Sequence, residues 1–240
     1  MSTGAVVWHD LECGAYRRDI PLWLELAREH GGPILDVGAG TGRITLALAQ
    51  DGHDVVALDL DAELLAELDQ RARTLPVRTV CADARDFTLG DRFSLCIVPM
   101  QTIQLLGGES GRLAFLGCAQ RHLVPDGVLA AAITEQLEPF ALTDGGPAPL
   151  PDMGEFDGVL YSSQPTAIRV QDGRFVLERR RETVGGSGER TVSRDLVALD
   201  AVTAEHLGRE GKAAGLRPAE VRDIPPTADH VGSRVVMFHA

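Results

Sequence analysis

A glycine-rich stretch, ILDVGAGTG at residues 34–42, holds the densest group of residues that could do chemistry in this sequence. An apolar run ends in Asp36, and Gly38 and Gly40 follow it in a turn that opens a helix. Because glycine has no Cβ, this turn lets a ligand approach the backbone where a side chain would collide. Loops of this kind lie at the carboxyl ends of parallel strands, where open α/β sheets bind ligands. The stretch therefore predicts a ligand-binding loop.

Two further aspartates follow apolar runs at matching places. Asp59 comes after residues 54–58, and Asp83 comes after residues 77–82. A carboxylate at position 59 can accept hydrogen bonds from both hydroxyls of a ribose. Asp83 can accept one from an adenine amino group, while the backbone N–H of Ala84 contacts a ring nitrogen. Each aspartate alone also fits a turn or a helix N-cap, but three behind one glycine loop favour an adenosine-containing ligand.

These residues require a parallel sheet to bring them together. Near-continuous apolar strands are expected at residues 33–37, 54–58, 77–82, 93–98 and 127–134, and helices at 42–50, 62–73 and 110–123. Such alternation is typical of an α/β fold whose parallel sheet is covered on both faces.

The pattern changes after residue 140. A Gly/Pro/Asp-rich segment, 141–154, precedes short strands expected at 159–161, 167–170, 174–181 and 190–199. A helix is expected at 204–214, ended by Gly215 as a C′ glycine, and two strands at 217–224 and 233–239. We expect one core, residues 1–140 and 201–240, with a small antiparallel β lid, residues 141–200, that contributes to an acceptor pocket.

Composition narrows the class of partner. With 240 residues, 44% of them hydrophobic, the chain can form one sizeable core. The net charge is −12, and the basic residues are 22 arginines and one lysine, Lys212. Apart from the short run Arg179–Arg181 the sequence shows no basic face, which disfavours nucleic acid binding. No apolar run is long enough for a membrane span, and the N-terminus lacks a signal-peptide pattern. Four scattered cysteines fit neither a disulfide framework nor a zinc site, and favour the cytoplasm.

The acid followed by GxGxG resembles the first motif of class I S-adenosylmethionine-dependent methyltransferases. The resemblance implies a Rossmann-like seven-stranded sheet of order 3-2-1-4-5-7-6, with the last strand antiparallel. It also implies S-adenosyl-L-methionine as cofactor and S-adenosyl-L-homocysteine as product. The fourth strand, which ends before Pro99, resembles the family's fourth motif but has Ser94 where aspartate is common. The cofactor-binding residues implied are Asp36, Gly38, Gly40, Asp59, Leu60, Asp83, Ala84 and Pro99.

The segment 8–23 resembles the part of many relatives that folds over the cofactor. By this resemblance Tyr16 covers the methionine end and Arg18 meets its carboxylate; both also fit as helix-surface residues. A nicotinamide-binding Rossmann domain is the main rival, but its GxGxxG motif needs glycine where this chain has Arg43. A catalytically silent, cofactor-binding partner subunit also remains open.

The residues that would bind the methyl acceptor are not marked by a motif. Methyl transfer from a sulfonium is an in-line displacement that mainly needs alignment in a dry pocket. We expect Glu135, as a base or orienting acid, and Gln104 to be catalytic, although a solvated loop glutamate and a helix-terminal glutamine fit as well. Gln101, Phe156 and Tyr161 are expected to bind the acceptor. The prediction is metal-independent transfer to a nitrogen, oxygen or carbon of a small molecule, by a monomer or homodimer, with no nucleic acid or membrane partner.

Overall fold

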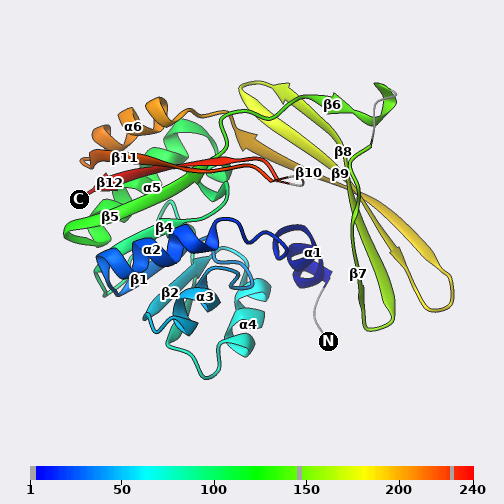
Figure 1. Ribbon diagram of the computed structural model, residues 1–240, viewed down its shortest axis with the longest axis horizontal. Helices are drawn as coiled ribbons and strands as arrows, with labels where there is room; N and C mark the ends of the chain where they lie inside the picture. The colour runs from blue at the N-terminus through cyan, green and yellow to red at the C-terminus, as the bar shows by residue number, and fades with distance from the viewer. Residues whose placement is uncertain (1–3, 145–147, 228–229) are drawn as a thin grey trace. The chain divides into compact units, whose positions relative to one another are not determined.

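The computed structural model describes residues 4–144, 148–227 and 230–240 (Figure 1). The chain divides into two compact units. The core unit comprises Tyr16–Glu135 and Val202–Ala240, and the second unit comprises Met1–Ala15 and Gln136–Ala201.

The core unit is built on a seven-stranded sheet. Its order is β11-β12-β5-β4-β1-β2-β3, in which the first five strands of the chain run parallel and β12 is antiparallel to both of its neighbours. This arrangement confirms the predicted sheet order and fold class. The strands are β1 (Ile34–Val37), β2 (Val55–Asp59), β3 (Val77–Cys81), β4 (Phe93–Val98), β5 (Leu123–Ile133), β11 (Arg217–Ile224) and β12 (Ser233–His239).

Helices cover both faces of this sheet. The side chains of α2, α3 and α4 pack with residues of one face, and those of α5 and α6 pack with residues of the other. Successive side chains of a strand point to opposite faces, so Ile34 meets the first group and Leu35 the second. The helices are α2 (Ile20–His30), α3 (Thr45–Gln50), α4 (Ala62–Arg71), the 3₁₀ turn η1 (Thr102–Leu105), α5 (Gly108–His122) and α6 (Ala204–Ala213).

Local sequence accounts for several helix ends. The helix expected from residue 42 begins only at Thr45, and Gly42, with a φ of 95°, lies in the turn that precedes it. Asp61 caps α4 by accepting the backbone N–H groups of Glu63 and Leu64. Gly215, with a φ of 89°, follows α6 as predicted for a C′ glycine.

The second unit is an antiparallel sheet with one helix. Its sheet order is β10-β9-β8-β6, and β7 pairs with β8 as well. No helix in the described ranges is long and apolar enough to cross a membrane. The elements of this unit are α1 (Gly4–Cys13), β6 (Phe140–Ala141), the 3₁₀ turn η2 (Leu142–Asp144), β7 (Asp152–Phe156), β8 (Val159–Gln171), β9 (Arg174–Val184) and β10 (Arg190–Asp200).

One expected break is absent in this sheet. The strands predicted at 159–161 and 167–170 form the single strand β8, and part of the expected linker at 141–154 forms β7. Proline cannot donate to a strand ladder, and Pro165 lies between the two predicted strands. The proline lies at a shift in the register with β9, between the stretch of β8 that pairs with β7 and the stretch that pairs with β6. β8 pairs with β9 both before and after this register shift.

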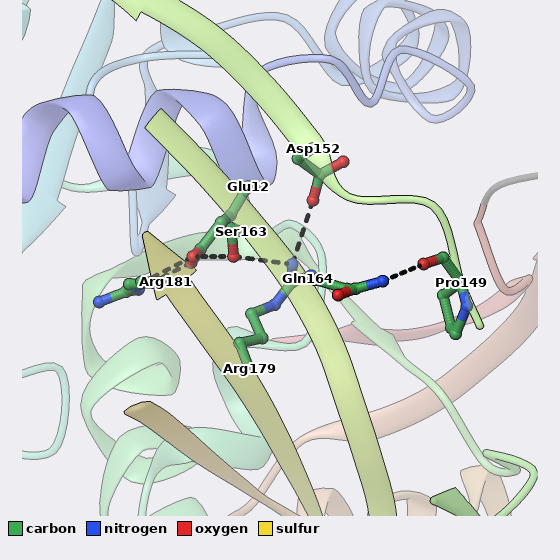
Figure 2. Close-up of polar contacts among 7 residues, drawn as sticks. All are labelled: Glu12, Pro149, Asp152, Ser163, Gln164, Arg179 and Arg181. Carbon is green, nitrogen blue, oxygen red and sulfur yellow. Dashed lines mark hydrogen bonds and ion pairs between the residues drawn. The ribbon is translucent and has the colours of Figure 1, made fainter. Parts of the chain in front are cut away.

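Helix α1 belongs to the second unit, although the sequence assigned residues 1–15 to the core. Arg181 of β9 donates two hydrogen bonds of 2.8 Å to the carboxylate of Glu12. Ser163 of β8 donates to the same carboxylate at 2.7 Å and accepts from Arg179, which also pairs with Asp152 (Figure 2). Burial alone would raise the pKa of Glu12, but the hydrogen bonds from Arg181 and Ser163 lower it. This charged cluster attaches the helix to the sheet.

Candidate active site

The glycine loop lies between β1 and α3 in the conformation that its composition requires. Gly38, Gly40 and Gly42 have φ values of 75°, 55° and 95°, which side-chain-bearing residues rarely adopt. A Cβ on Gly38 would lie 2.4 Å from the Cγ2 atom of Thr102. The N–H groups of Gly38 and Ala39 donate to the carbonyl of Leu58, at 2.8 and 3.2 Å, so the loop is fixed against the end of β2.

Asp36 lies on β1 beneath this loop and is 1% exposed. The Thr45 hydroxyl donates to its Oδ2 atom at 2.6 Å, whereas its Oδ1 atom is buried without a hydrogen-bond partner among the described residues. Burial raises the pKa of Asp36 to about 6, although the Thr45 hydrogen bond and the charge of Arg43 oppose the rise. A buried carboxylate oxygen with no donor is costly, and a ligand with an N–H group would satisfy it.

Asp59 and Leu60 lie at the carboxyl end of β2. The Oδ2 atom of Asp59 accepts the N–H of Gly40 at 2.8 Å, and Oδ1 accepts the N–H of Asp61 at 2.9 Å. The carboxylate therefore supports the glycine loop and remains half-buried. The Leu60 side chain is 69% exposed.

Asp83 follows β3 and is held by its neighbour. Arg85 donates to the Asp83 carboxylate through its backbone N–H at 2.9 Å and through its guanidinium at 2.6 to 3.1 Å. The side-chain hydrogen bonds from Arg85 lower the pKa of Asp83 to about 2. Ala84 is buried. The sequence predicted the acid here but not the arginine that orients it.

Tyr16 is buried, and Arg18 is exposed. The Tyr16 hydroxyl oxygen is buried without a hydrogen-bond partner among the residues that the structure describes, and burial raises its pKa. The ring centre of His230 lies 4.9 Å from that of Tyr16, and the guanidinium carbon of Arg43 lies 5.2 Å from it. In the sequence, Arg43 stands where the nicotinamide motif needs a glycine, and its contact with Tyr16 was not predicted.

Gln104, predicted to be catalytic, is hydrogen-bonded to the backbone of Thr134. Its side-chain nitrogen donates to the carbonyl of Thr134 at 3.0 Å, and its side-chain oxygen accepts the N–H of Thr134 at 2.8 Å. The backbone of one residue, Thr134, thus engages both ends of the fully buried Gln104 amide. Gln101 donates to the Ser233 hydroxyl at 3.4 Å, and Pro99 is buried with its carbonyl accepting from Thr102.

Glu135 is also held by structural partners. Its Oε1 atom accepts the N–H of Ala204, the first residue of α6, at 2.6 Å. Arg234 of β12 pairs with the same carboxylate at 3.2 and 3.3 Å. Glu135 therefore stabilises a helix N-terminus and is not the solvated loop residue that was the alternative to the predicted base.

Phe156 and Tyr161 belong to an aromatic cluster of the second unit. Their rings meet edge to face with centres 5.8 Å apart, and Trp8 of α1 meets Tyr161 at 5.0 Å in the same geometry. Arg181 lies over the Trp8 ring at 5.3 Å. The three rings are partly exposed, and Trp8 was not predicted as a member.

The residues predicted to bind the cofactor gather at one edge of the core sheet. The carboxyl ends of β1, β2 and β3 place Asp36, Asp59 and Asp83 around the glycine loop, because these strands run parallel. Within the described residues, no group of three or more His, Cys, Asp or Glu side chains could hold a metal ion.

Comparison with known proteins agrees with this geometry. Residues 34–127 match the family described as "Methyltransferase domain". The chain is 32% identical over 108 residues to the cypemycin N-terminal methyltransferase of a Streptomyces species, covering 45% of this chain and 44% of that protein. It is 33% identical over 117 residues to the dTDP-3-amino-3,6-dideoxy-alpha-D-glucopyranose N,N-dimethyltransferase of Streptomyces fradiae, covering 48% and 45%. The matched stretch is thus less than half the length of these relatives.

A solved structure extends the similarity in fold to the whole chain. The sugar N-methyltransferase KedS8 of Streptoalloteichus superposes with a TM-score of 0.74 at 18% identity, covering 100% of this chain and 93% of that one. The family match identifies residues 34–127 as a methyltransferase domain, and the sheet order and the glycine loop are those of the class I S-adenosylmethionine-dependent fold. The family and the cofactor predicted from the motifs are confirmed.

Proposed function

We propose that this chain transfers the methyl group of S-adenosylmethionine to a nitrogen atom of a small-molecule acceptor. The observation that carries the proposal is the glycine loop, with its three left-handed glycines and the Asp59 carboxylate bonded to it. When bound, the cofactor supplies an electrophilic methyl group on a sulfonium. The chain binds and orients: Asp59 accepts from the ribose hydroxyls, and Leu60 packs on the adenine, whose edge contacts Asp83 and Ala84.

Two orphaned polar atoms fit the amino-acid end of this cofactor. The Tyr16 hydroxyl is a buried donor and the Asp36 Oδ1 atom is a buried acceptor, and neither has a hydrogen-bond partner among the described residues. A carboxylate and an ammonium group on one ligand would satisfy both. Such groups are costly to bury unpaired, so we assign Tyr16 and Asp36 to the methionine moiety, with Gly38 and Gly40 lining it.

Nitrogen is the acceptor atom that best matches the partners of the two predicted catalytic residues. Glu135 and Gln104 are engaged by Ala204, Arg234 and Thr134. A hydroxyl or carbon acid must lose a proton to a base, whereas a neutral amine attacks through its lone pair. The two curated relatives and KedS8 are likewise described as methyltransferases of an N-terminus, an amino sugar and a sugar nitrogen.

We further propose that the second unit selects the acceptor and that no metal ion takes part. The aromatic rings of Phe156 and Tyr161 are partly exposed, and partly exposed rings can pack against a sugar or another flat molecule. Displacement at a sulfonium releases a neutral leaving group, so a Lewis acid is not required. Gln101, predicted to touch the acceptor, stays part of this proposal.

The test is a turnover assay with the purified chain. S-adenosylhomocysteine formation is measured by mass spectrometry with S-adenosylmethionine and a panel of primary and secondary amines, amino sugars included, beside matched alcohols. The amines should turn over and the alcohols should not, and the rate should rise with pH as each amine loses its proton. Turnover of the alcohols alone would contradict the nitrogen assignment.

Binding separates the alternatives. Calorimetry should show S-adenosylhomocysteine binding and no NAD binding. If S-adenosylhomocysteine binds but no acceptor turns over without an added partner protein, the chain is the cofactor-binding subunit that the sequence left open.

A further inference from the structure

Arg43 and Asp19 form a buried ion pair next to the glycine loop. The NH1 and NH2 atoms of Arg43 donate to the two carboxylate oxygens of Asp19 at 2.6 and 2.8 Å. The side chains are 8% and 1% exposed, and the indole N–H of Trp23 donates to the same carboxylate at 3.0 Å. Buried charges persist only with well-placed partners, so this geometry is tightly fixed.

The same arginine fixes Tyr16 in two ways. Its NH1 atom donates to the Tyr16 carbonyl at 2.9 Å, and its guanidinium carbon lies 5.2 Å from the centre of the Tyr16 ring. The His230 ring packs against the phenol ring as well, with centres 4.9 Å apart. The backbone and the ring of Tyr16 are therefore held, while its hydroxyl remains without a partner among the described residues.

The charges around this hydroxyl suit an anionic ligand group. Burial raises the pKa of Tyr16, and the charge of Asp19 adds to the rise, so the phenol stays protonated and can donate. Arg43 and Arg18 act on Tyr16 with positive charge. A carboxylate is an acceptor of the right sign for this donor.

We propose that Arg43, paired with Asp19, is a positioning residue for cofactor binding. It holds Tyr16 so that the phenol donates to the methionine carboxylate of S-adenosylmethionine. This inference rests on the proposed function, since it concerns the same cofactor. It replaces the sequence-based assignment of that carboxylate to Arg18, which is exposed.

Two nucleosides probe the idea: S-adenosylhomocysteine, and 5′-methylthioadenosine, which keeps the adenosine and the sulfur but lacks the amino-acid end. Affinities are measured by calorimetry for wild type, Tyr16→Phe, the double variant Arg43→Gln/Asp19→Asn and the triple variant that combines them. Removing both charges together avoids leaving one buried alone. Arg28→Gln is the matched control, because Arg28 makes a similar two-bond pair with Asp51 on the surface.

The Tyr16 and double variants should each weaken S-adenosylhomocysteine binding about tenfold and change 5′-methylthioadenosine binding less than about twofold. The triple variant should bind S-adenosylhomocysteine about as well as the Tyr16→Phe protein. The effects of the substitutions are not additive when one residue acts through another. Arg28→Gln should match wild type.

Equal weakening of both nucleosides by the double variant would overturn the proposal, since it would show general support of the loop. An additive triple variant would overturn the route through Tyr16. If the double variant fails to unfold cooperatively, Arg43→Lys replaces it, because lysine keeps the charge but lacks the planar fork; the same outcomes then apply. A wild-type protein that binds neither nucleoside would contradict the proposed function instead.

Discussion

Replacing Asp59 with alanine removes a carboxylate that has two roles in this structure. Its two oxygens accept the N–H groups of Gly40 and Asp61 at 2.8 and 2.9 Å, and it is assigned to the ribose hydroxyls of the cofactor. Hydrogen bonds to a charged group contribute about 1.5–3 kcal/mol each. Because Asp59 is only half-buried, the lower end of that range applies.

The loss of the two backbone bonds should therefore cost about 3 kcal/mol of unfolding free energy. For a chain of this size, that lowers the melting temperature by about 6–12 °C. The loss of the ribose contacts should weaken S-adenosylhomocysteine binding at least about tenfold. Asp59→Asn should fall between the two proteins, since it keeps one acceptor oxygen.

Asp61→Ala is the matched control. Asp61 caps α4 through the N–H groups of Glu63 and Leu64, at 2.8 and 3.2 Å, so its loss should cost about 1 kcal/mol and leave nucleoside affinity unchanged. Thermal unfolding and calorimetry measure the two effects separately. An Asp59→Ala protein that binds S-adenosylhomocysteine as wild type does would refute the ribose assignment.

Three other predictions follow from burial and close contact. Burial raises the pKa of Asp36 from 3.8 to about 6, so between those pH values the folded protein holds a proton that the unfolded chain releases, and stability falls as pH rises through this window. Asp36→Asn should remove that fall in urea unfolding between pH 4 and 7; an unchanged slope would contradict the burial argument. Gly38→Ala should abolish S-adenosylhomocysteine binding in calorimetry, because its Cβ would lie 2.4 Å from Thr102, whereas Gly52→Ala, at a φ of 94° with nothing within 4 Å, should bind normally. Glu135→Ala should lower the melting temperature through the loss of about 1 kcal/mol at the α6 N-terminus and leave the pH profile of turnover unchanged; a stable protein without turnover would restore Glu135 as a base.

The sequence by itself determined the elements of the core and the place of the glycine loop among them. Apolar runs bounded by Asp36, Asp59 and Asp83 predicted parallel strands, and the structure has them within a residue or two at each end. Glycine spacing predicted a loop of left-handed residues, which Gly38 and Gly40 form. These features depend on local backbone preferences and on side-chain periodicity, both of which are present in a short stretch of sequence.

Only the tertiary structure decided which polar side chains are engaged. Glu135 accepts from a residue 69 positions away, Arg43 pairs with a residue 24 positions away, and Arg181 joins α1 to β9 across 169 positions. Nothing in the local sequence around a charged residue specifies a distant partner, because that partner is chosen by the packing of whole elements. For the same reason the sequence could not show that Glu135 and Gln104 are hydrogen-bonded to the backbone, or that Arg43 contacts Tyr16.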